Sequence, residues 1–145
     1  ESRGLGDVYK RQVQASVPEK LIAPKLEADW WANAARVEED LGVETWYVGY
    51  ITPDDQYIGL TQAFETNPSW LANKLQGNWL DVTLEIEGRT WEVWPTLLPS
   101  VPKGTKEYAM VHSFDKQAVV IYGTASEEDF LKLATQISLD LNKEN

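Results

Sequence analysis

The chain has 145 residues, no cysteine and a formal net charge of -10 at pH 7. This length fits one domain that buries about 70% of its unfolded surface, so its core needs no disulfide staples. Without cysteine there is no disulfide framework, thiol chemistry or thiolate metal site. The acidic charge argues against nucleic acid and anionic lipid as partners, because both require a basic surface. No apolar run of the sequence approaches the roughly 20 residues of a membrane span.

The first twelve residues, ESRGLGDVYKRQ, show no periodicity and resemble the translated adapter tail seen at the ends of many metagenomic gene sequences. We therefore expect residues 1–12 to be a non-native or disordered tail, and we leave them out of the fold. We expect residues 13–145 to form a single domain. Such a tail also implies that the native N-terminus is missing, together with any signal peptide or membrane anchor.

The next segments lead into a sheet. Val13–Val17 fits a short strand or part of a helix, and Pro18–Pro24 is expected to be extended, because proline disfavours helix in the residue before it. Trp30–Glu38 is predicted to be a strand, and Asp40–Gly42 is predicted to turn the chain into the next one.

The segment Thr45–Phe64 reads as two strands joined by a tight turn. Its side chains alternate with the period of two that strands require. Thr52–Asp55 suits a type I turn, because Pro53 presets φ at the second position and aspartate tolerates the next one. This hairpin indicates an antiparallel sheet.

A short helix is predicted next. Asn67 can cap the free N–H groups, and Pro68 suits the first helical position, where its missing donor costs nothing. Trp70, Leu71 and Leu75 give the helix an apolar side, and it is expected to end near Gly77.

Two more hairpins follow. Asp81–Trp94 is expected to form one around a turn at Glu87–Gly88. Pro95–Lys106 holds three prolines and must be a loop or an edge segment. Glu107–Ser113 and Gln117–Tyr122 form the last predicted hairpin.

The chain closes with a strong helix signal, which starts at a cap formed by Ser126 and acidic residues in the first turn. Its apolar stripe consists of Phe130, Leu133, Ala134, Ile137 and Leu141. We therefore predict an α+β fold: an antiparallel sheet of about seven strands in a meander of hairpins, with the C-terminal helix packed on one face and a short inserted helix.

Four stretches of this chain resemble one known family. They are DWWANAARV (Asp29–Val37), TWYVGYITPDDQYIGLTQAF (Thr45–Phe64), GRTWEVW (Gly88–Trp94) and VVIYGTASEEDFLKLA (Val119–Ala134). On these residues the chain resembles the actinobacterial family known as domain of unknown function 4245. It departs from the family pattern at Asp29, where glycine is usual, and at Ala34, where serine is usual.

The resemblance implies a single-pass cell-envelope protein, with an N-terminal membrane helix and this domain on the extracytoplasmic side of the cell membrane. The anchor would precede the present fragment, so we expect contact with the membrane only through that missing segment. The resemblance carries over no activity, cofactor, partner or functional residue.

The sequence contains few candidate residues for catalysis or metal binding. His112 is the only histidine and shares a strand face with Tyr108 and Met110, so we expect a structural or surface histidine rather than a catalytic one. Asp54–Asp55 and Glu38–Asp40 read as solvated residues at strand ends, with a calcium site as the alternative. We expect no catalytic residue, metal ion or cofactor. A carboxylate pair that meets through space stays possible.

The seven tryptophans are the unusual feature: Trp30, Trp31, Trp46, Trp70, Trp79, Trp91 and Trp94. Most are expected in the core, where a sheet covered by one or two helices needs large side chains. The alternative is a binding surface for sugars, lipid or a protein. Because Trp30 and Trp31 point to opposite faces, as do Trp91 and Trp94, one member of each pair can face outward. Trp31 and Trp94 are the binding candidates, and Arg36 is expected to pair with a nearby carboxylate.

These observations lead to a functional hypothesis with one main alternative. The first is a non-catalytic extracytoplasmic domain of a membrane-anchored envelope protein that contacts a protein or a cell-wall component. The alternative is a small-molecule or lipid-binding domain with a pocket between the sheet and the C-terminal helix. An enzyme of unknown class is the third and weakest hypothesis.

Overall fold

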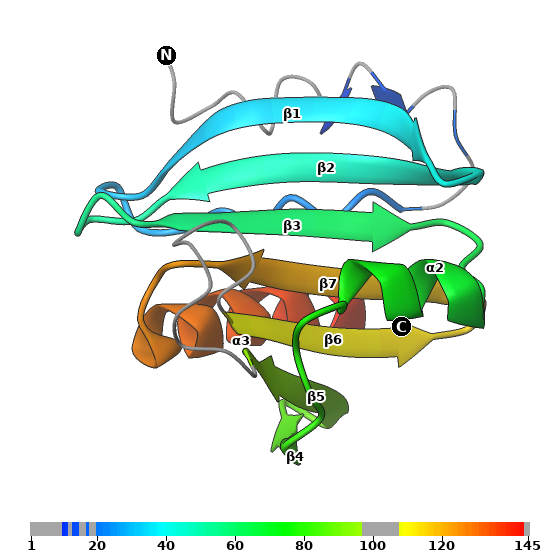
Figure 1. Ribbon diagram of the computed structural model, residues 1–145. Helices are drawn as coiled ribbons and strands as arrows, with labels where there is room; N and C mark the ends of the chain where they lie inside the picture. Colours follow the sequence, from blue (N-terminus) through cyan, green and yellow to red (C-terminus); the bar gives the residue numbers. More distant parts are fainter. Residues whose placement is uncertain (1–9, 12, 15–16, 18–19, 97–107, 144–145) are drawn as a thin grey trace.

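The computed structural model describes residues 10–11, 13–14, 17, 20–96 and 108–143. Its central element is an antiparallel sheet of seven strands in the order β1-β2-β3-β7-β6-β5-β4 (Figure 1). The elements are β1 (Trp31–Asp40), β2 (Val43–Ile51), β3 (Tyr57–Ala63), α2 (Pro68–Lys74), β4 (Val82–Ile86), β5 (Arg89–Pro95), β6 (Tyr108–Phe114), β7 (Gln117–Gly123) and α3 (Glu127–Asn142). The predicted α+β class is confirmed, with its C-terminal helix and short inserted helix.

The hairpin turns lie where the sequence predicts them. Leu41–Gly42 and Glu87–Gly88 are two-residue turns in which every φ is positive, between 51° and 81°. This is the type I′ geometry that matches the twist of the flanking strands. In the wider turn, the Asp55 N–H donates to the Thr52 carbonyl over 2.9 Å, and Asp55 itself is left-handed with φ 61°. A type I turn followed by a left-handed residue is a common hairpin connection.

The strand order divides the sheet into two ribbons of sequence-adjacent strands. Strands β1 to β3 form one ribbon and β4 to β7 form the other. They are joined by the pairing of β3 with β7, in which Ile58 lies opposite Gly123 and Ala63 lies opposite Ala118. The sheet is therefore two meanders joined side by side, an arrangement that the local sequence patterns did not specify.

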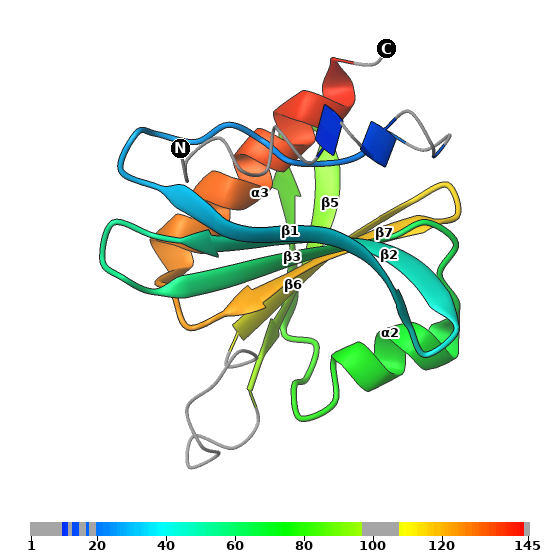
Figure 2. The same ribbon diagram turned by 90° about the horizontal axis from the view of Figure 1, so that it is seen from above.

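The larger core lies between the sheet and α3, which crosses one face (Figure 2). The Ser126 hydroxyl accepts from the Asp129 N–H over 3.2 Å and caps the helix, as predicted. Phe130, Leu133 and Ile137 are completely buried against the sheet. The space between sheet and helix is therefore filled by side chains.

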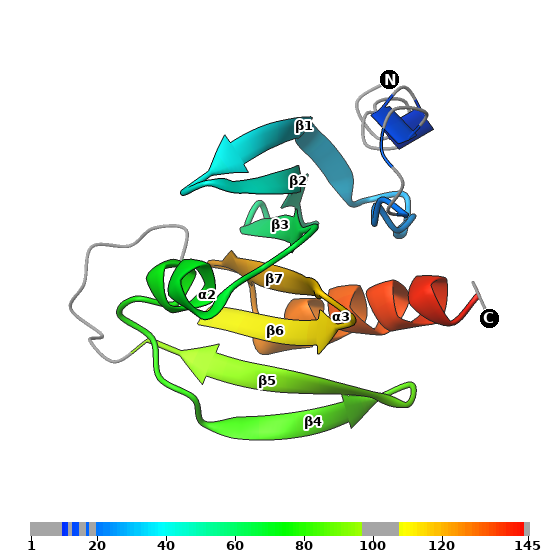
Figure 3. The same ribbon diagram turned by 90° about the vertical axis from the view of Figure 1, so that its right-hand side faces the viewer.

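An N-terminal segment, residues 20–30, lies on the same face as α3 (Figure 3). Leu21 and Ile22 are buried, and the side chain of Gln62 holds the segment by its backbone. The Ile22 N–H donates to Gln62 Oε1 over 3.0 Å, and Gln62 Nε2 donates to the Lys20 carbonyl over 2.9 Å. Residues 20–24 lie in neither a helix nor a strand, and the extended geometry expected for Pro18–Pro24 stays a prediction. Farther upstream, Val13 and Gln14 are helical, which favours the helical alternative for that stretch.

The opposite face of the sheet is covered in part by α2 (Figures 2 and 3). Asn67 Oδ1 accepts from the Trp70 N–H over 2.8 Å and Pro68 opens the helix, as predicted. This second core contains Val43, Ala63, Trp70, Leu75, Ala109, Val111 and Val120.

At the far end of β5, Thr96 forms a bridge with Asn78, and the rest of the predicted 95–106 loop lies outside the described residues. In the part of the chain that the structure describes, no helix combines the length and the apolar character needed to cross a membrane.

Candidate functional site

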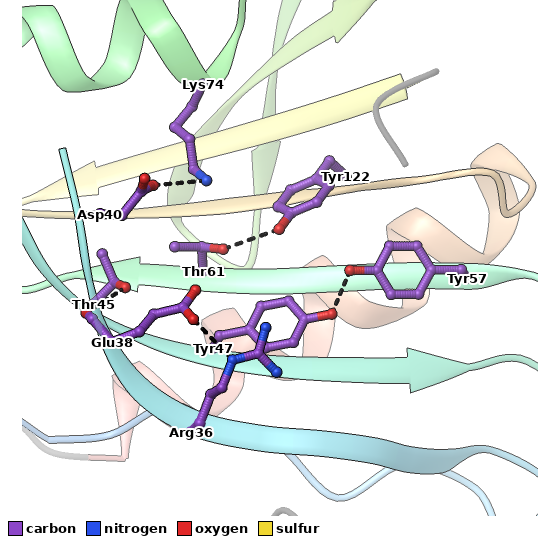
Figure 4. Close-up of polar contacts among 9 residues, drawn as sticks. All are labelled: Arg36, Glu38, Asp40, Thr45, Tyr47, Tyr57, Thr61, Lys74 and Tyr122. Atoms are coloured by element: carbon purple, nitrogen blue, oxygen red, sulfur yellow. Dashed lines mark hydrogen bonds and ion pairs between the residues drawn. The ribbon is translucent and has the colours of Figure 1, made fainter. Parts of the chain in front are cut away.

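A cluster of hydroxyl groups lies on the α2 side of the sheet, centred on β2, β3 and β7 (Figure 4). The hydroxyl oxygens of Tyr47 and Tyr57 are 2.5 Å apart, and those of Thr61 and Tyr122 are 3.3 Å apart. The rings of Tyr57 and Tyr122 meet edge to face with centroids 6.3 Å apart. We call these four side chains the tyrosine face. Three phenols gathered on one sheet face are a candidate binding site.

Two glycines explain why the tyrosines can lie in this way. Gly49 and Gly59 are opposite each other in the β2–β3 ladder. A Cβ on Gly49 would lie 2.8 Å from the Tyr47 hydroxyl, and one on Gly59 would collide with the hydroxyl of Tyr57. The tyrosine rings therefore occupy space that any other residue at these two positions would fill, and the two hydroxyls meet above the glycines.

Two cations flank the tyrosine face, each paired with a carboxylate. The Arg36 guanidinium lies 4.5 Å from the centre of the Tyr47 ring and donates to Glu38 Oε1 over 2.8 Å, which confirms the expected carboxylate partner. Lys74 Nζ lies 2.8 Å from Asp40 Oδ2. The charges beside the phenols are thus balanced, and the site favours a polar ligand without a large net charge.

The phenols act as neutral groups. Loss of solvation on burial raises the pKa of both Tyr47 and Tyr57. Both hydroxyls therefore keep their protons at physiological pH, and one donates to the other. Tyr47 is 8% exposed and Tyr57 is partly buried, so only a limited part of the pair can face a ligand, and that part is neutral rather than an ionised nucleophile.

Trp31, one of the two predicted binding tryptophans, lies on this same side of the sheet. It pairs with Ile51, which shares a strand face with Tyr47 because side chains alternate along β2. Its exposed fraction is 38%, as expected for an outward-facing residue. A binding role for Trp31 stays a prediction.

Trp94, the second predicted residue, also lies on the α2 side but is not fully exposed. It pairs with Ala109, which in turn pairs with Tyr122. The indole packs against the second core and donates to Glu92 Oε1 over 3.0 Å. The Trp94 indole is therefore less exposed than expected for an outward-facing residue, because packing beside α2 covers part of the ring. Its binding role also stays a prediction.

The sequence-based reasoning missed two features. Trp79 is 41% exposed but was not singled out. The tyrosine face was missed as well, although its signal is present: Tyr47 and Tyr57 each precede a glycine by two positions, so each pair shares a strand face.

His112 has a structural role. It is 5% exposed, and its ring stacks between Trp91 and Phe114 with centroids 5.3 Å away on each side. Nε2 lies 3.1 Å from a nitrogen of Arg89, which can only donate, so Nε2 accepts and Nδ1–H donates to the Thr90 carbonyl over 2.9 Å. Burial lowers the pKa of His112, which keeps the ring neutral.

A groove of about 780 Å³ lies on the outer flank of α3, between this helix and residues 25–30. Leu26, Trp30 and Leu131 supply apolar surface, and the Lys132–Glu27 ion pair of 3.4 Å lies at its edge. The groove is thus beside the helix and not in the predicted position between helix and sheet. Among the described residues, no three His, Asp or Glu side chains are grouped closely enough to hold a metal ion.

The fold and the site define an α+β domain with a half-covered sheet, whose open face carries aromatic and hydroxyl groups. Residues 8–137 match the family described as "Protein of unknown function (DUF4245)", and the chain belongs to that family. The resemblance stated from the four sequence stretches is therefore confirmed. No curated protein matches the chain.

Proposed function

We propose that this protein is a non-catalytic binding domain that contacts a protein or a cell-wall component through the tyrosine face and Trp31. The observation that carries the proposal is the exposed Trp31 indole on the same sheet face as three clustered phenols. An exposed indole beside the partly exposed phenols of Tyr57 and Tyr122 offers contact area and hydrogen-bond donors, and such groups are common in binding surfaces.

The site fits a ligand that has both apolar ring faces and hydroxyl groups, as sugar units of a cell wall do. From Trp31 on β1 to Trp94 on β5 the face crosses six strands. At a strand spacing of about 4.8 Å this distance is roughly 24 Å, long enough for several units of a chain-like ligand.

We also propose a location outside the cytoplasm, in a protein tethered to the membrane by a segment outside this fragment. The support for this location is what the family resemblance implies. Protease treatment of intact cells that make the natural full-length protein tests it. Digestion of this domain is the expected result, and full protection of the domain in intact cells would contradict it.

Thermal unfolding of the chain with soluble peptidoglycan fragments and cell-wall oligosaccharides tests the binding role. A ligand at 100 times its Kd should add about 2.7 kcal/mol, which raises Tm by several degrees for a domain of this size. Trp31→Ala should remove the shift. Trp79→Ala is the matched control, because that indole is equally exposed but lies at the other end of the sheet. If both variants lost the ligand-induced increase in Tm to the same extent, or if no fragment raised the Tm of the unmodified chain, the result would contradict binding at this site.

The groove beside α3 favours a second candidate function, the binding of a small apolar molecule or lipid. Its volume is within the range of ligand sites, and Leu131 is 41% exposed within it. A fluorescent fatty acid would probe this function, and Leu131→Glu should abolish its binding. Unchanged binding in that variant would exclude the groove.

A further inference from the structure

Strand β4 is one of the two edges of the sheet, and its ladder pairs it only with β5 in the described residues. The two-residue turn at Glu87–Gly88 determines which backbone groups of β4 form hydrogen bonds with β5. Ile86 and Arg89 next to it form a hydrogen-bonded pair, so Val82 and Leu84 also bond to β5. The N–H and C=O groups of Thr83 and Glu85 therefore point away from β5, toward the free edge.

This edge extends beyond the strand itself. The N–H groups of Trp79 and Asp81 donate to the carbonyls of Pro95 and Val93 over 3.0 and 2.9 Å. Val82 is also opposite Val93, so the chain has a β-bulge at Asp81–Val82. Paired backbone runs from Asn78 to Ile86, roughly 27 Å at 3.4 Å per residue.

Three apolar side chains are exposed along the edge. Trp79, Leu80 and Val82 are 41%, 45% and 47% exposed. Natural sheet edges are usually protected by charge, bulges or cover, and exposed apolar residues next to unpaired backbone mark a strand-addition site. If this segment faced only solvent, polar side chains would be expected in place of these three exposed apolar residues.

The charge around the edge indicates the kind of partner. The segment from 81 to 92 carries Asp81, Glu85, Glu87 and Glu92 against a single cation, Arg89. That cation is already engaged, because its Nε donates to Asn142 Oδ1 over 2.9 Å and its NH1 contacts His112. The edge is therefore acidic.

We propose that the β4 edge binds an extended basic segment of a partner protein as an additional strand. A second copy of this chain fits poorly, because antiparallel pairing around Thr83 would place Glu85 of one copy opposite Asp81 of the other. The bulge and carboxylates thus oppose self-pairing, whereas lysine or arginine in a partner strand would be favoured. The proposal goes beyond the proposed function, because it uses a different surface from Trp31 and the tyrosine face.

A blocked seven-residue peptide of alternating valine and lysine is the probe, and its valine–glutamate counterpart is the control. Fluorescence polarisation should show binding of the basic peptide alone. Hydrogen exchange should show new protection at the amides of Thr83 and Glu85. Trp79→Ala should weaken this binding and Trp31→Ala should not, which separates this surface from the cell-wall site.

Thr83→Pro is the decisive variant. Its ring removes an outward N–H and blocks the approaching strand, while proline is tolerated at an edge position whose N–H faces solvent. We expect about tenfold weaker binding or a complete loss, with Tm close to that of Thr83→Val, which keeps the N–H. Three results would overturn the proposal: equal binding by Thr83→Pro and Thr83→Val, peptide binding without amide protection, or protection that rises with protein concentration in the absence of peptide. The last would indicate self-association.

Discussion

Gln62 is expected to hold the N-terminal segment in place, and replacing it with methionine tests this. Gln62 is completely buried, and its amide makes three hydrogen bonds. Two go to the backbone of Ile22 and Lys20, and the third, over 2.7 Å, goes to Gln117 Oε1. Methionine keeps the length and most of the volume of the side chain but removes all three bonds.

The expected loss follows from these contacts. Each net hydrogen bond contributes about 1 kcal/mol, and a buried group left without a partner costs about 1–3 kcal/mol. The Ile22 N–H is such a group, so Gln62→Met should lose about 2–4 kcal/mol of unfolding free energy. For a domain of this size this is a fall in Tm of roughly 6–15 °C.

Urea unfolding followed by tryptophan fluorescence measures the loss, and hydrogen exchange at Ile22 shows whether the segment is released. Gln56→Met is the control, because Gln56 is exposed and, among the described residues, the one hydrogen bond of its side chain is a 3.4 Å bond to the Asp54 carbonyl. Gln62→Glu adds a pH test. A carboxylate cannot donate to the Lys20 carbonyl, but its protonated form can, so the deficit should shrink as pH falls. A loss below 0.5 kcal/mol for Gln62→Met would refute the reasoning.

Burial lowers the pKa of His112 below its usual value of about 6.5, so the unfolded chain binds this proton more readily than the folded chain does. The unfolding free energy that His112 contributes should be complete above about pH 6.5 and should decline as pH falls toward the folded-state pKa. Urea titrations of His112→Gln should show no such decline. Gly59→Ala should displace the Tyr57 ring and cost about 1–3 kcal/mol, measured by calorimetry, and an unchanged Tm would show that the ring moves freely. Asn67→Ala should cost about 1 kcal/mol through loss of the α2 cap, whereas Asn67→Asp should retain most of it, and equal losses would contradict the capping role.

Much of the fold could be predicted because its signals are local. The caps at Asn67 and Ser126 and the turn at Glu87–Gly88 each depend on two to four neighbouring residues. Such signals indicate where an element begins or ends, and they do so independently of distant parts of the chain. The expected carboxylate partner of Arg36 was local too, since Glu38 is two residues away on the same strand face.

Features that depend on distant segments could not be predicted in the same way. The half-burial of Trp94 results from packing beside α2, which lies 20 residues and more upstream. The tyrosine face depends on the register that places Gly49 opposite Gly59, and on β7 lying next to β3, which brings Tyr122 beside them. The alternation of side chains along a strand predicts which face of the sheet each side chain occupies. It does not predict which side chain of the adjacent strand lies beside it.

The junction between β3 and β7 has a consequence for how the chain folds. Every other strand neighbour in the sheet is also a neighbour in sequence, so both ribbons can begin as local hairpins. The pairing of Ile58 with Gly123 joins the residues that are farthest apart in sequence among the paired strands, so it costs the most loop entropy. The pairing of β3 with β7 is therefore expected to be the slowest step in the assembly of the sheet. Substitutions along it should slow folding, while substitutions in the outer hairpins should mainly speed unfolding.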